Sequence, residues 1–207
     1  MNIRAYLRKY FIMGSQNCPK HQTPENILRQ AIDGGITAFQ YREKGEGSLE
    51  GDEKIILGKK LRSICQEANI PFIINDDIEL IEELKVDGIH VGQDDTPVET
   101  LRNSFPNLII GLSVSNKDEL KRSNIDLIDY VGAGAVFTTA TKKDATQAVG
   151  LQWIETLRKE QPDLPIVGIG GINEDNAHQV IDAGADGVAV ISAITQANNI
   201  TKVVQAL

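Results

Sequence analysis

The chain has 207 residues, of which 41% are hydrophobic and 24% are charged, and its formal net charge is -8. This length suits one α/β barrel or two small domains. The negative balance argues against nucleic acid as the main partner, because phosphate-backbone binding normally requires a basic face, and no apolar run is long enough to span a membrane. Cys18 and Cys65 lack metal-ligand spacing, and no secretion signal is visible. We therefore expect a cytoplasmic protein that holds any anionic ligand through a local cluster of cations.

Strand-like and helix-like segments alternate along the whole chain. The stretch Thr23-Pro24-Glu25-Asn26 is typical of a helix start, with a capping threonine, a proline and an early acid. Further helical patterns cover residues 53–68, 98–104, 151–160 and 174–183. Apolar runs predict strands at 10–13, 38–41, 72–74, 88–91, 108–112, 130–132, 166–169 and 187–191. About eight strand–helix units favour a closed (β/α)8 TIM barrel, built as a single domain over residues 1–207.

A weak internal repeat supports the barrel. Asp87-Gly88-Ile89-His90-Val91 resembles Asp186-Gly187-Val188-Ala189-Val190, with looser copies at 33–36 and 129–131. Each copy lies where a helix ends and a strand begins, so we assign these aspartates to the stability end of the barrel. The long polar segments 45–52 and 137–150 follow strands instead, and we expect them over the active-site mouth.

The end of the second strand carries an amide and two cations at alternate positions. Gln40, Arg42 and Lys44 point the same way if the strand geometry continues. An arginine fork, a lysine charge and an amide donor together suit a phosphate or pyrophosphate. The alternative is a solvated strand end, in which the two cations pair with Glu43 and Glu46.

Carboxylates follow the third and fourth strands. Asp76 and Asp77 end one strand, and Asp94 and Asp95 end the next. Magnesium typically takes one or two carboxylates plus substrate phosphate oxygens, so these neighbouring ends could share one cation. Alternatively, one aspartate of the first pair caps the following helix. We interpret His90, within the fourth strand, as a hydrogen-bonded barrel residue.

The fifth strand leads to Ser113 and Ser115, where a serine near the mouth can donate to a phosphate, although Ser115-Asn116 can also cap the next helix. The ends of the second to fifth strands thus make a first anion site that suits a pyrophosphate, and the ends of the sixth to eighth strands suit a second anion, a monophosphate. Threonines and lysines follow the sixth strand at 138–143, where the alternative is a flexible polar loop. Glycines after the seventh strand and a short helix start after the eighth are typical of the phosphate cradle of a barrel. Two anion sites, a divalent metal and no strong nucleophile predict a transferase that joins two phosphorylated substrates and releases pyrophosphate.

Six motifs, taken together, resemble one known family. QYREK, IINDD, HVGQDD, TTATKK, GIGGI and VISAI occur in this order over essentially the whole chain, and the chain is thereby similar to the thiamine-phosphate synthases. The resemblance implies that hydroxymethylpyrimidine pyrophosphate and thiazole phosphate are joined to give thiamine phosphate, with Mg²⁺ as cofactor. It also implies a dissociative mechanism, in which pyrophosphate leaves before the thiazole nitrogen captures the pyrimidine carbocation.

The resemblance also implies roles for individual residues. It places around the pyrimidine pyrophosphate Gln40, Tyr41, Arg42, Glu43, Lys44, Asn75, Ser113 and Lys142, of which Arg42, Lys44, Ser113 and Lys142 are catalytic. It makes Asp76 and Asp95 the Mg²⁺ ligands. It assigns to the thiazole phosphate Thr139, Ala140, Thr141, Gly171, Ile191 and Ser192.

The chain departs from the family pattern at two strand ends. The family has two prolines after the sixth strand, whereas this chain has Ala135 and Thr138 in that region, and Val114-Ser115-Asn116 lacks a histidine common after the fifth strand. Three other functions stay open: a thiazole tautomerase, another phosphate-binding barrel isomerase, and a regulatory barrel that binds thiamine precursors without turnover. We expect two small phosphorylated substrates, no nucleic acid and no membrane as partners. The sequence leaves a homo-oligomer open.

Overall fold

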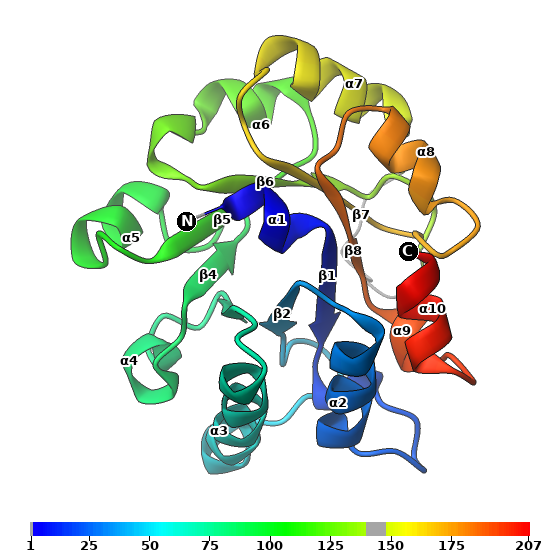
Figure 1. Ribbon diagram of the computed structural model, residues 1–207. Coiled ribbons are helices and arrows are strands. Elements are labelled where there is room, and N and C mark those ends of the chain that lie inside the picture. Colours follow the sequence, from blue (N-terminus) through cyan, green and yellow to red (C-terminus); the bar gives the residue numbers. More distant parts are fainter. Residues whose placement is uncertain (1, 140–147) are drawn as a thin grey trace.

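The computed structural model describes residues 2–139 and 148–207. Its strands form one closed parallel barrel in chain order, with the first strand paired to the eighth (Figure 1). The predicted (β/α)8 barrel is therefore confirmed. The strands are β1 (Lys9–Met13), β2 (Ala38–Tyr41), β3 (Phe72–Asn75), β4 (Gly88–Val91), β5 (Ile109–Val114), β6 (Tyr130–Gly134), β7 (Ile166–Ile169) and β8 (Gly187–Val190).

Two strands reach further toward the mouth than their apolar runs predict. β5 continues to Val114 and β6 to Gly134, and the two pair over this extension, with Ser113 opposite Gly132 and Val114 opposite Ala133. The polar Ser113 therefore belongs to a strand and not to the following loop. Its backbone is fixed by the sheet.

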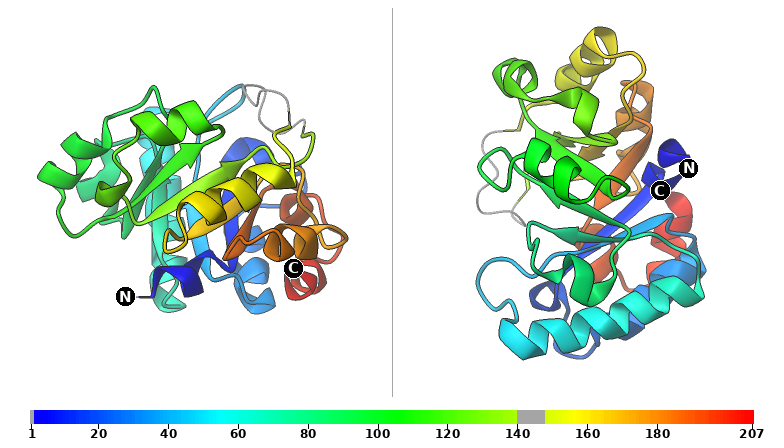
Figure 2. Two further views of the ribbon diagram at one scale, coloured as in Figure 1. Left: turned by 90° about the horizontal axis from the view of Figure 1, so that it is seen from above. Right: turned by 90° about the vertical axis from the view of Figure 1, so that its left-hand side faces the viewer.

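Helices surround the barrel (Figures 1 and 2). They are α1 (Ile3–Leu7), α2 (Pro24–Gly34), α3 (Gly51–Glu67), α4 (Leu80–Leu84), α5 (Val98–Ser104), α6 (Lys117–Arg122), α7 (Leu151–Glu160), α8 (Ala177–Asp182), α9 (Ser192–Thr195) and α10 (Ile200–Ala206), with short 3-10 turns at Ser15–Asn17 and Ile125–Leu127. In the described part of the chain, no helix is both long and apolar enough to cross a membrane.

The ends of two helices test the predicted boundaries. The Thr23 side chain accepts a hydrogen bond from the Asn26 amide, which confirms the predicted start of α2, and Gly35 ends that helix with φ of 95°. The helix predicted over 174–183 is too long, since α8 begins only at Ala177. The side chains of Asn173 and Asn176 accept hydrogen bonds from nearby backbone amides at 2.9 Å and stabilise a turn there instead.

Alternation along each strand divides the apolar residues into two cores. In β2, Phe39 and Tyr41 pack outward in the layer beneath the helices. Ala38 faces the barrel interior with Ile73 and Ile109. Leu7 of α1 packs against this inner cluster, so α1 lies across the end of the barrel opposite the mouth (Figure 1).

The repeated aspartates lie at this same closed end. Three of the four, Asp87, Asp129 and Asp186, each accept a hydrogen bond from a backbone amide of the preceding strand and pair with an arginine from the helix before that strand, whereas Asp33 makes no such pair among the described residues. The sets are Asp87 with Phe72 and Arg62, Asp129 with Ile110 and Arg102, and Asp186 with Ile166 and Arg158. The sequence repeat therefore corresponds to a repeated structural clamp, as its predicted stability role requires.

Candidate active site

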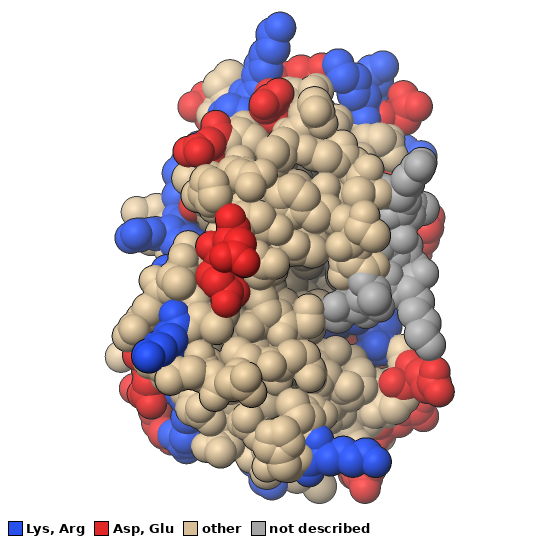
Figure 3. All heavy atoms as spheres, turned by 90° about the vertical axis from the view of Figure 1, so that its right-hand side faces the viewer, with Lys and Arg blue, Asp and Glu red and all other residues tan. Residues whose placement is uncertain are grey.

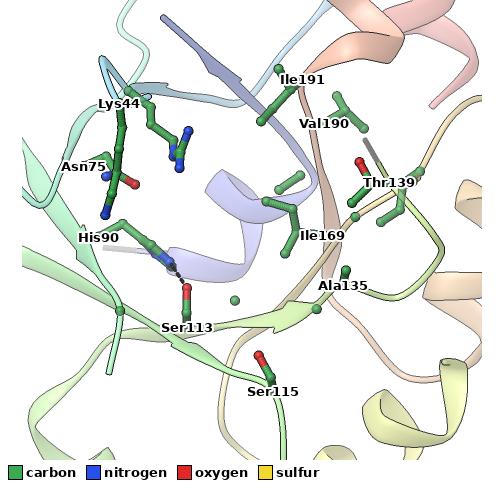
Figure 4. Close-up of a pocket in the computed structure, with 18 of the residues that line it drawn as sticks. Lys44, Asn75, His90, Ser113, Ser115, Ala135, Thr139, Ile169, Val190 and Ile191 are labelled. Atoms are coloured by element: carbon green, nitrogen blue, oxygen red, sulfur yellow. Dashed lines mark hydrogen bonds between the residues drawn. The ribbon is translucent and has the colours of Figure 1, made fainter. Parts of the chain in front are cut away.

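One cavity of about 220 Å³ opens at the carboxyl ends of the strands. Figure 4 shows Lys44, Asn75, His90 and Ser113 on one side of it and Thr139, Ile169, Val190 and Ile191 on the other. The structure brings ten of the predicted site residues to its lining: Arg42, Lys44, Asn75, Asp76, Asp95, Ser113, Thr139, Gly171, Ile191 and Ser192. The predicted residues Ala140, Thr141 and Lys142 lie outside the described residues.

Arg42 brings a buried positive charge to the cavity. The residue is only 9% exposed, and its backbone amide is held by the Met13 carbonyl at 3.0 Å. Among the described residues, no carboxylate or carbonyl accepts a hydrogen bond from its guanidinium group. A buried guanidinium is costly without a partner, so this position suits an anionic ligand.

Glu43 does not neutralise that charge. Its carboxylate accepts hydrogen bonds from the amide of Ser15 at 2.5 Å, the hydroxyl of Ser15 at 2.9 Å and the amide of Leu49 at 2.8 Å. It therefore ties β2 to two loops. The alternative in which Arg42 and Lys44 pair with Glu43 is not what the structure has.

Lys44 lies between two carboxylates. Its ammonium is 2.6 Å from Oδ2 of Asp76 and 4.0 Å from Oδ1 of Asp95. The hydrogen bond to Asp76 raises the pKa of Lys44. Burial raises the pKa of the Asp76 carboxyl and the nearby Asp95 adds to that rise, while Lys44 opposes it. Two carboxylates thus meet at one point that attracts a cation.

The backbone fixes both carboxylates. Asp76 has φ of 62°, a left-handed conformation uncommon for non-glycine residues, and its amide is bound by the His90 carbonyl at 3.0 Å. Asp95 accepts a hydrogen bond from the Gly92 amide at 2.7 Å through Oδ2, which leaves Oδ1 toward Lys44. Asp77 points elsewhere and pairs with Lys54 at 2.5 Å.

This donor set fits a magnesium ion. No group of three or more acidic, histidine or cysteine side chains gathers in the described residues. Magnesium does not need such a cage, because it usually binds through one or two carboxylates and completes its shell with water and substrate phosphate. Asp76 and Asp95 have the right chemistry and converge on one cation position.

Three of the predicted pyrimidine-site residues lie outside the cavity lining. Gln40 is inside the barrel, where its amide donates to the Tyr10 hydroxyl at 3.0 Å. Tyr41 faces outward and donates to the Lys54 carbonyl at 3.0 Å. Glu43 makes the loop contacts described above. The motif is continuous in sequence, but only Arg42 and Lys44 of it reach the cavity.

The second side of the cavity is built mainly from backbone and small residues. Gly170 and Gly171 have φ of 105° and 64°, and a Cβ atom on Gly171 would lie 2.6 Å from the Thr138 carbonyl oxygen. The Phe137 amide donates to the Gly170 carbonyl at 3.0 Å. The strand-six and strand-seven loops are therefore packed directly on one another beside the start of α9.

Several lining residues were not identified as binding residues from the sequence. They are Gly92, Gly132, Gly134, Ala135, Ile169, Ile172, Ala189 and Val190, together with His90. Their signal is position alone, because all of them lie at or near strand ends. His90 has the hydrogen-bonded role that we predicted, with Ser113 at 2.9 Å (Figure 4). Asn116 caps α6 through the amides of Asp118 and Glu119, so that alternative is confirmed beside the lining role of Ser115.

The cations of the cavity form a local cluster. On the face shown in Figure 3, lysines and arginines are dispersed among aspartates and glutamates. The cavity instead brings Arg42 and Lys44 together at one place, beside the carboxylates of Asp76 and Asp95. Walls of low dielectric strengthen the field of such a local group of charges.

A family model described as thiamine monophosphate synthase matches residues 9–194. The chain belongs to this family. It is 59% identical over 201 residues to the thiamine-phosphate synthase of Oceanobacillus iheyensis, covering 97% of each chain. It is 50% identical over 198 residues to that of Staphylococcus carnosus, covering 96% of this chain and 93% of the relative.

Solved structures agree with this membership. Thiamine phosphate pyrophosphorylase from Pyrococcus furiosus matches with a TM-score of 0.87 and 35% identity, covering 100% of this chain and 96% of that one. A structure described as native KDPGal matches with a TM-score of 0.65 at 15% identity, which supports the fold alone. The family, the transferase class and the synthase function that the six motifs predict are confirmed.

Proposed function

We propose that the cavity joins hydroxymethylpyrimidine pyrophosphate to thiazole phosphate, with the pyrophosphate on the side of Arg42 and Lys44. The observation that carries this assignment is the buried guanidinium of Arg42, which has no acceptor among the described residues and lies on the cavity. A buried cation of this kind is stabilised by a polyanion that accepts its planar fork of donors.

The first chemical step breaks the bond between the pyrimidine methylene carbon and the pyrophosphate oxygen. The electron pair leaves with the oxygen, so negative charge grows on the pyrophosphate. Arg42, Lys44 and the Ser113 hydroxyl are proposed to donate to it, with Asn75 and Lys142 completing the set. Donors that are already in place stabilise growing charge most effectively.

Asp76 and Asp95 are the proposed ligands of Mg²⁺. When bound, the ion would neutralise charge on the leaving pyrophosphate as a Lewis acid. The two carboxylates contribute by fixing the position at which the pyrophosphate oxygens meet a divalent charge. Lys44, which now bridges them, would then be available to the pyrophosphate.

The thiazole phosphate is proposed to occupy the opposite side. Its phosphate would be held by backbone amides at Gly171 and Ser192 and by the hydroxyl of Thr139, with Ala140, Thr141 and Ile191 beside it. This placement brings the ring nitrogen toward the pyrimidine carbon. That nitrogen carries no proton, so its lone pair forms the new bond without a general base.

The direct test is turnover. Purified protein, both substrates and Mg²⁺ should yield thiamine phosphate, detected by fluorescence after oxidation, and one pyrophosphate per product. Chelation of Mg²⁺ should abolish turnover and its return should restore it. Binding of both substrates without pyrophosphate release would favour the regulatory alternative. Turnover at the same rate in excess chelator would overturn the metal assignment.

A further inference from the structure

A continuous chain of hydrogen bonds crosses the barrel interior below the cavity. The Gln40 amide is 3.0 Å from the Tyr10 hydroxyl, which is 2.9 Å from the Tyr130 hydroxyl. Tyr130 is 3.0 Å from Nδ1 of His90, and Nε2 of His90 is 2.9 Å from the Ser113 hydroxyl. This series of hydrogen bonds therefore links β2, β1, β6, β4 and β5, and it ends on Ser113, which lines the cavity.

The Gln40 amide at one end determines which group donates in each hydrogen bond of the series. An amide nitrogen only donates, so the Tyr10 oxygen accepts from Gln40. Tyr10 is 1% exposed, and among the described residues the Tyr130 oxygen is the one acceptor within reach of its proton. A buried hydroxyl proton requires an acceptor, so Tyr10 donates to Tyr130.

The direction continues to the cavity. Tyr130 accepts from Tyr10 and donates its own proton to Nδ1 of His90. With Nδ1 as an acceptor, the neutral His90 carries its proton on Nε2 and donates to the Ser113 oxygen. The Ser113 proton is then directed away from His90 and is available for a ligand in the cavity.

The barrel reserves space for these side chains. A Cβ atom on Gly111 would lie 2.5 Å from Nδ1 of His90 and would collide with the Tyr130 ring and hydroxyl. A Cβ atom on Gly132 would lie 3.0 Å from Cε1 of His90. The rings of His90 and Tyr130 are 5.5 Å apart and those of Tyr10 and Tyr130 are 5.9 Å apart, so both hydroxyls are held by packing as well as by hydrogen bonds.

We propose that Tyr10, Tyr130 and His90 are positioning residues that set the tautomer of His90 and so turn the Ser113 hydroxyl toward the leaving pyrophosphate. The inference rests on the proposed role of Ser113. Under this proposal, the role of Ser113 depends on the buried hydroxyls of Tyr10 and Tyr130, which do not line the cavity. Without the Tyr130 hydroxyl, Nδ1 loses its donor, and His90 can instead carry its proton on Nδ1 and accept from Ser113. The serine donor would then point away from the substrate.

A double-mutant cycle tests this dependence. Tyr130→Phe should lower kcat/KM for the pyrimidine pyrophosphate about tenfold, as expected when one donor to a charged oxygen is lost. The KM for thiazole phosphate should stay near the wild-type value. In a Ser113→Ala background, Tyr130→Phe should have less than about a twofold further effect, because residues that act through one another are not additive. Tyr6→Phe, in α1 at the closed end, serves as the control.

The outcomes separate this inference from the proposed function. Wild-type kinetics of Ser113→Ala alone would overturn the assignment of Ser113 to the pyrophosphate. A slow Ser113→Ala with an equal Tyr130→Phe effect in both backgrounds would overturn the positioning role and leave that assignment standing. Thermal melts of all variants detect any loss of folding. Tyr10→Phe, which breaks the chain one link earlier, provides a second variant if Tyr130→Phe folds poorly.

The His90 tautomer can also be measured directly. The chain has three histidines, His21, His90 and His178, so ¹⁵N NMR of histidine-labelled protein is simple to interpret. Wild-type His90 should carry its proton on Nε2, and Tyr130→Phe should shift the balance toward Nδ1. A wild-type His90 with its proton on Nδ1 would overturn the inference whatever the kinetics.

Discussion

The two sides of the cavity differ in the groups that they offer to an anionic ligand. The side of β2 to β5 presents the charged side chains of Arg42, Lys44, Asp76 and Asp95, whereas the side of β6 to β8 presents glycines, small residues and aliphatic side chains. Backbone amides carry fixed partial charges and suit a phosphate whose charge stays constant. Charged side chains that are already in place, together with a metal, suit an anion whose charge grows. With the substrates placed as proposed, we expect the first side to determine turnover and the second to determine binding.

Removing the Arg42 charge should produce the largest effect. Arg42→Gln should lower kcat about 100- to 1,000-fold, the range expected for loss of one preorganised donor to developing charge. Arg42→Lys keeps the charge but loses the planar fork, so its loss should be smaller. The KM for thiazole phosphate should change little in either variant.

Steady-state kinetics with both substrates varied would measure these changes. Arg29→Gln is a matched control, because Arg29 is an exposed residue of α2 that pairs with Glu67 at 3.5 Å. Wild-type turnover of Arg42→Gln would remove the basis for assigning the growing charge to this side. A rise in the thiazole KM alone would mean that the two sides are reversed.

A smaller effect, on binding, is expected from the second side. Gly171→Ala places a Cβ at φ of 64° and against the Thr138 carbonyl. Backbone strain of about 1–3 kcal/mol should displace the loop and raise the KM for thiazole phosphate roughly tenfold. The KM for the pyrimidine pyrophosphate should stay within about twofold of the wild-type value, because a change at one site has little effect on a separate site that shares no contacts with it.

Gly184→Ala controls for strain alone. Gly184 also has a positive φ, 108°, and a Cβ there would lie 3.1 Å from Arg158, but it precedes β8 at the closed end of the barrel. This variant should lower the melting temperature and leave both KM values unchanged. If both glycine variants raised the same KM, global loosening would explain the result better than a thiazole phosphate site.

Local sequence patterns predicted the strand ends well, because a parallel barrel brings all carboxyl ends to one mouth. The alternating pattern predicted one common direction for Gln40, Arg42 and Lys44, but the structure brings only Arg42 and Lys44 to the cavity, because the pattern could not give the depth of each residue. Depth follows from register: Gln40 pairs with Ile12 and Ile73, both in the inner core, and so lies beneath the cavity. Tyr41 pairs with Met13 and Ile74, both in the outer core, and so faces outward.

Contacts between distant segments were beyond local patterns. The hydrogen bond between Tyr10 and Tyr130 joins residues 120 positions apart and arises only when the barrel closes. The aspartate repeat was visible in the sequence, but its arginine partners were not, because they lie on helices one strand earlier. Lys44 was predicted to bind an anion, and its position between two carboxylates depends on the left-handed turn at Asp76.

The smallest expected effect concerns that Lys44 position. Its ammonium lies between the two proposed Mg²⁺ ligands, so we expect it to compete with Mg²⁺ in the substrate-free protein. Lys44→Met should therefore tighten Mg²⁺ binding to the protein alone, about twofold to fivefold, since an exposed ion pair is worth at most about 1 kcal/mol. Turnover should fall in the same variant, because the pyrophosphate loses a cation. Tighter Mg²⁺ binding together with lower turnover in Lys44→Met would show that the Lys44 ammonium competes with the metal and does not merely support the structure.

Calorimetric titration of Mg²⁺ into substrate-free protein would measure this effect. Lys54→Met is the matched control: Lys54 pairs with Asp77 at 2.5 Å, directly beside Asp76 in sequence but away from the cavity lining. Removing that lysine should leave Mg²⁺ affinity unchanged, which separates competition at the site from a general gain of negative charge. Weaker Mg²⁺ binding in Lys44→Met would mean that the lysine supports the carboxylate geometry. In that case Lys44 would position Asp76 and Asp95 for the metal and would not compete with the metal for them.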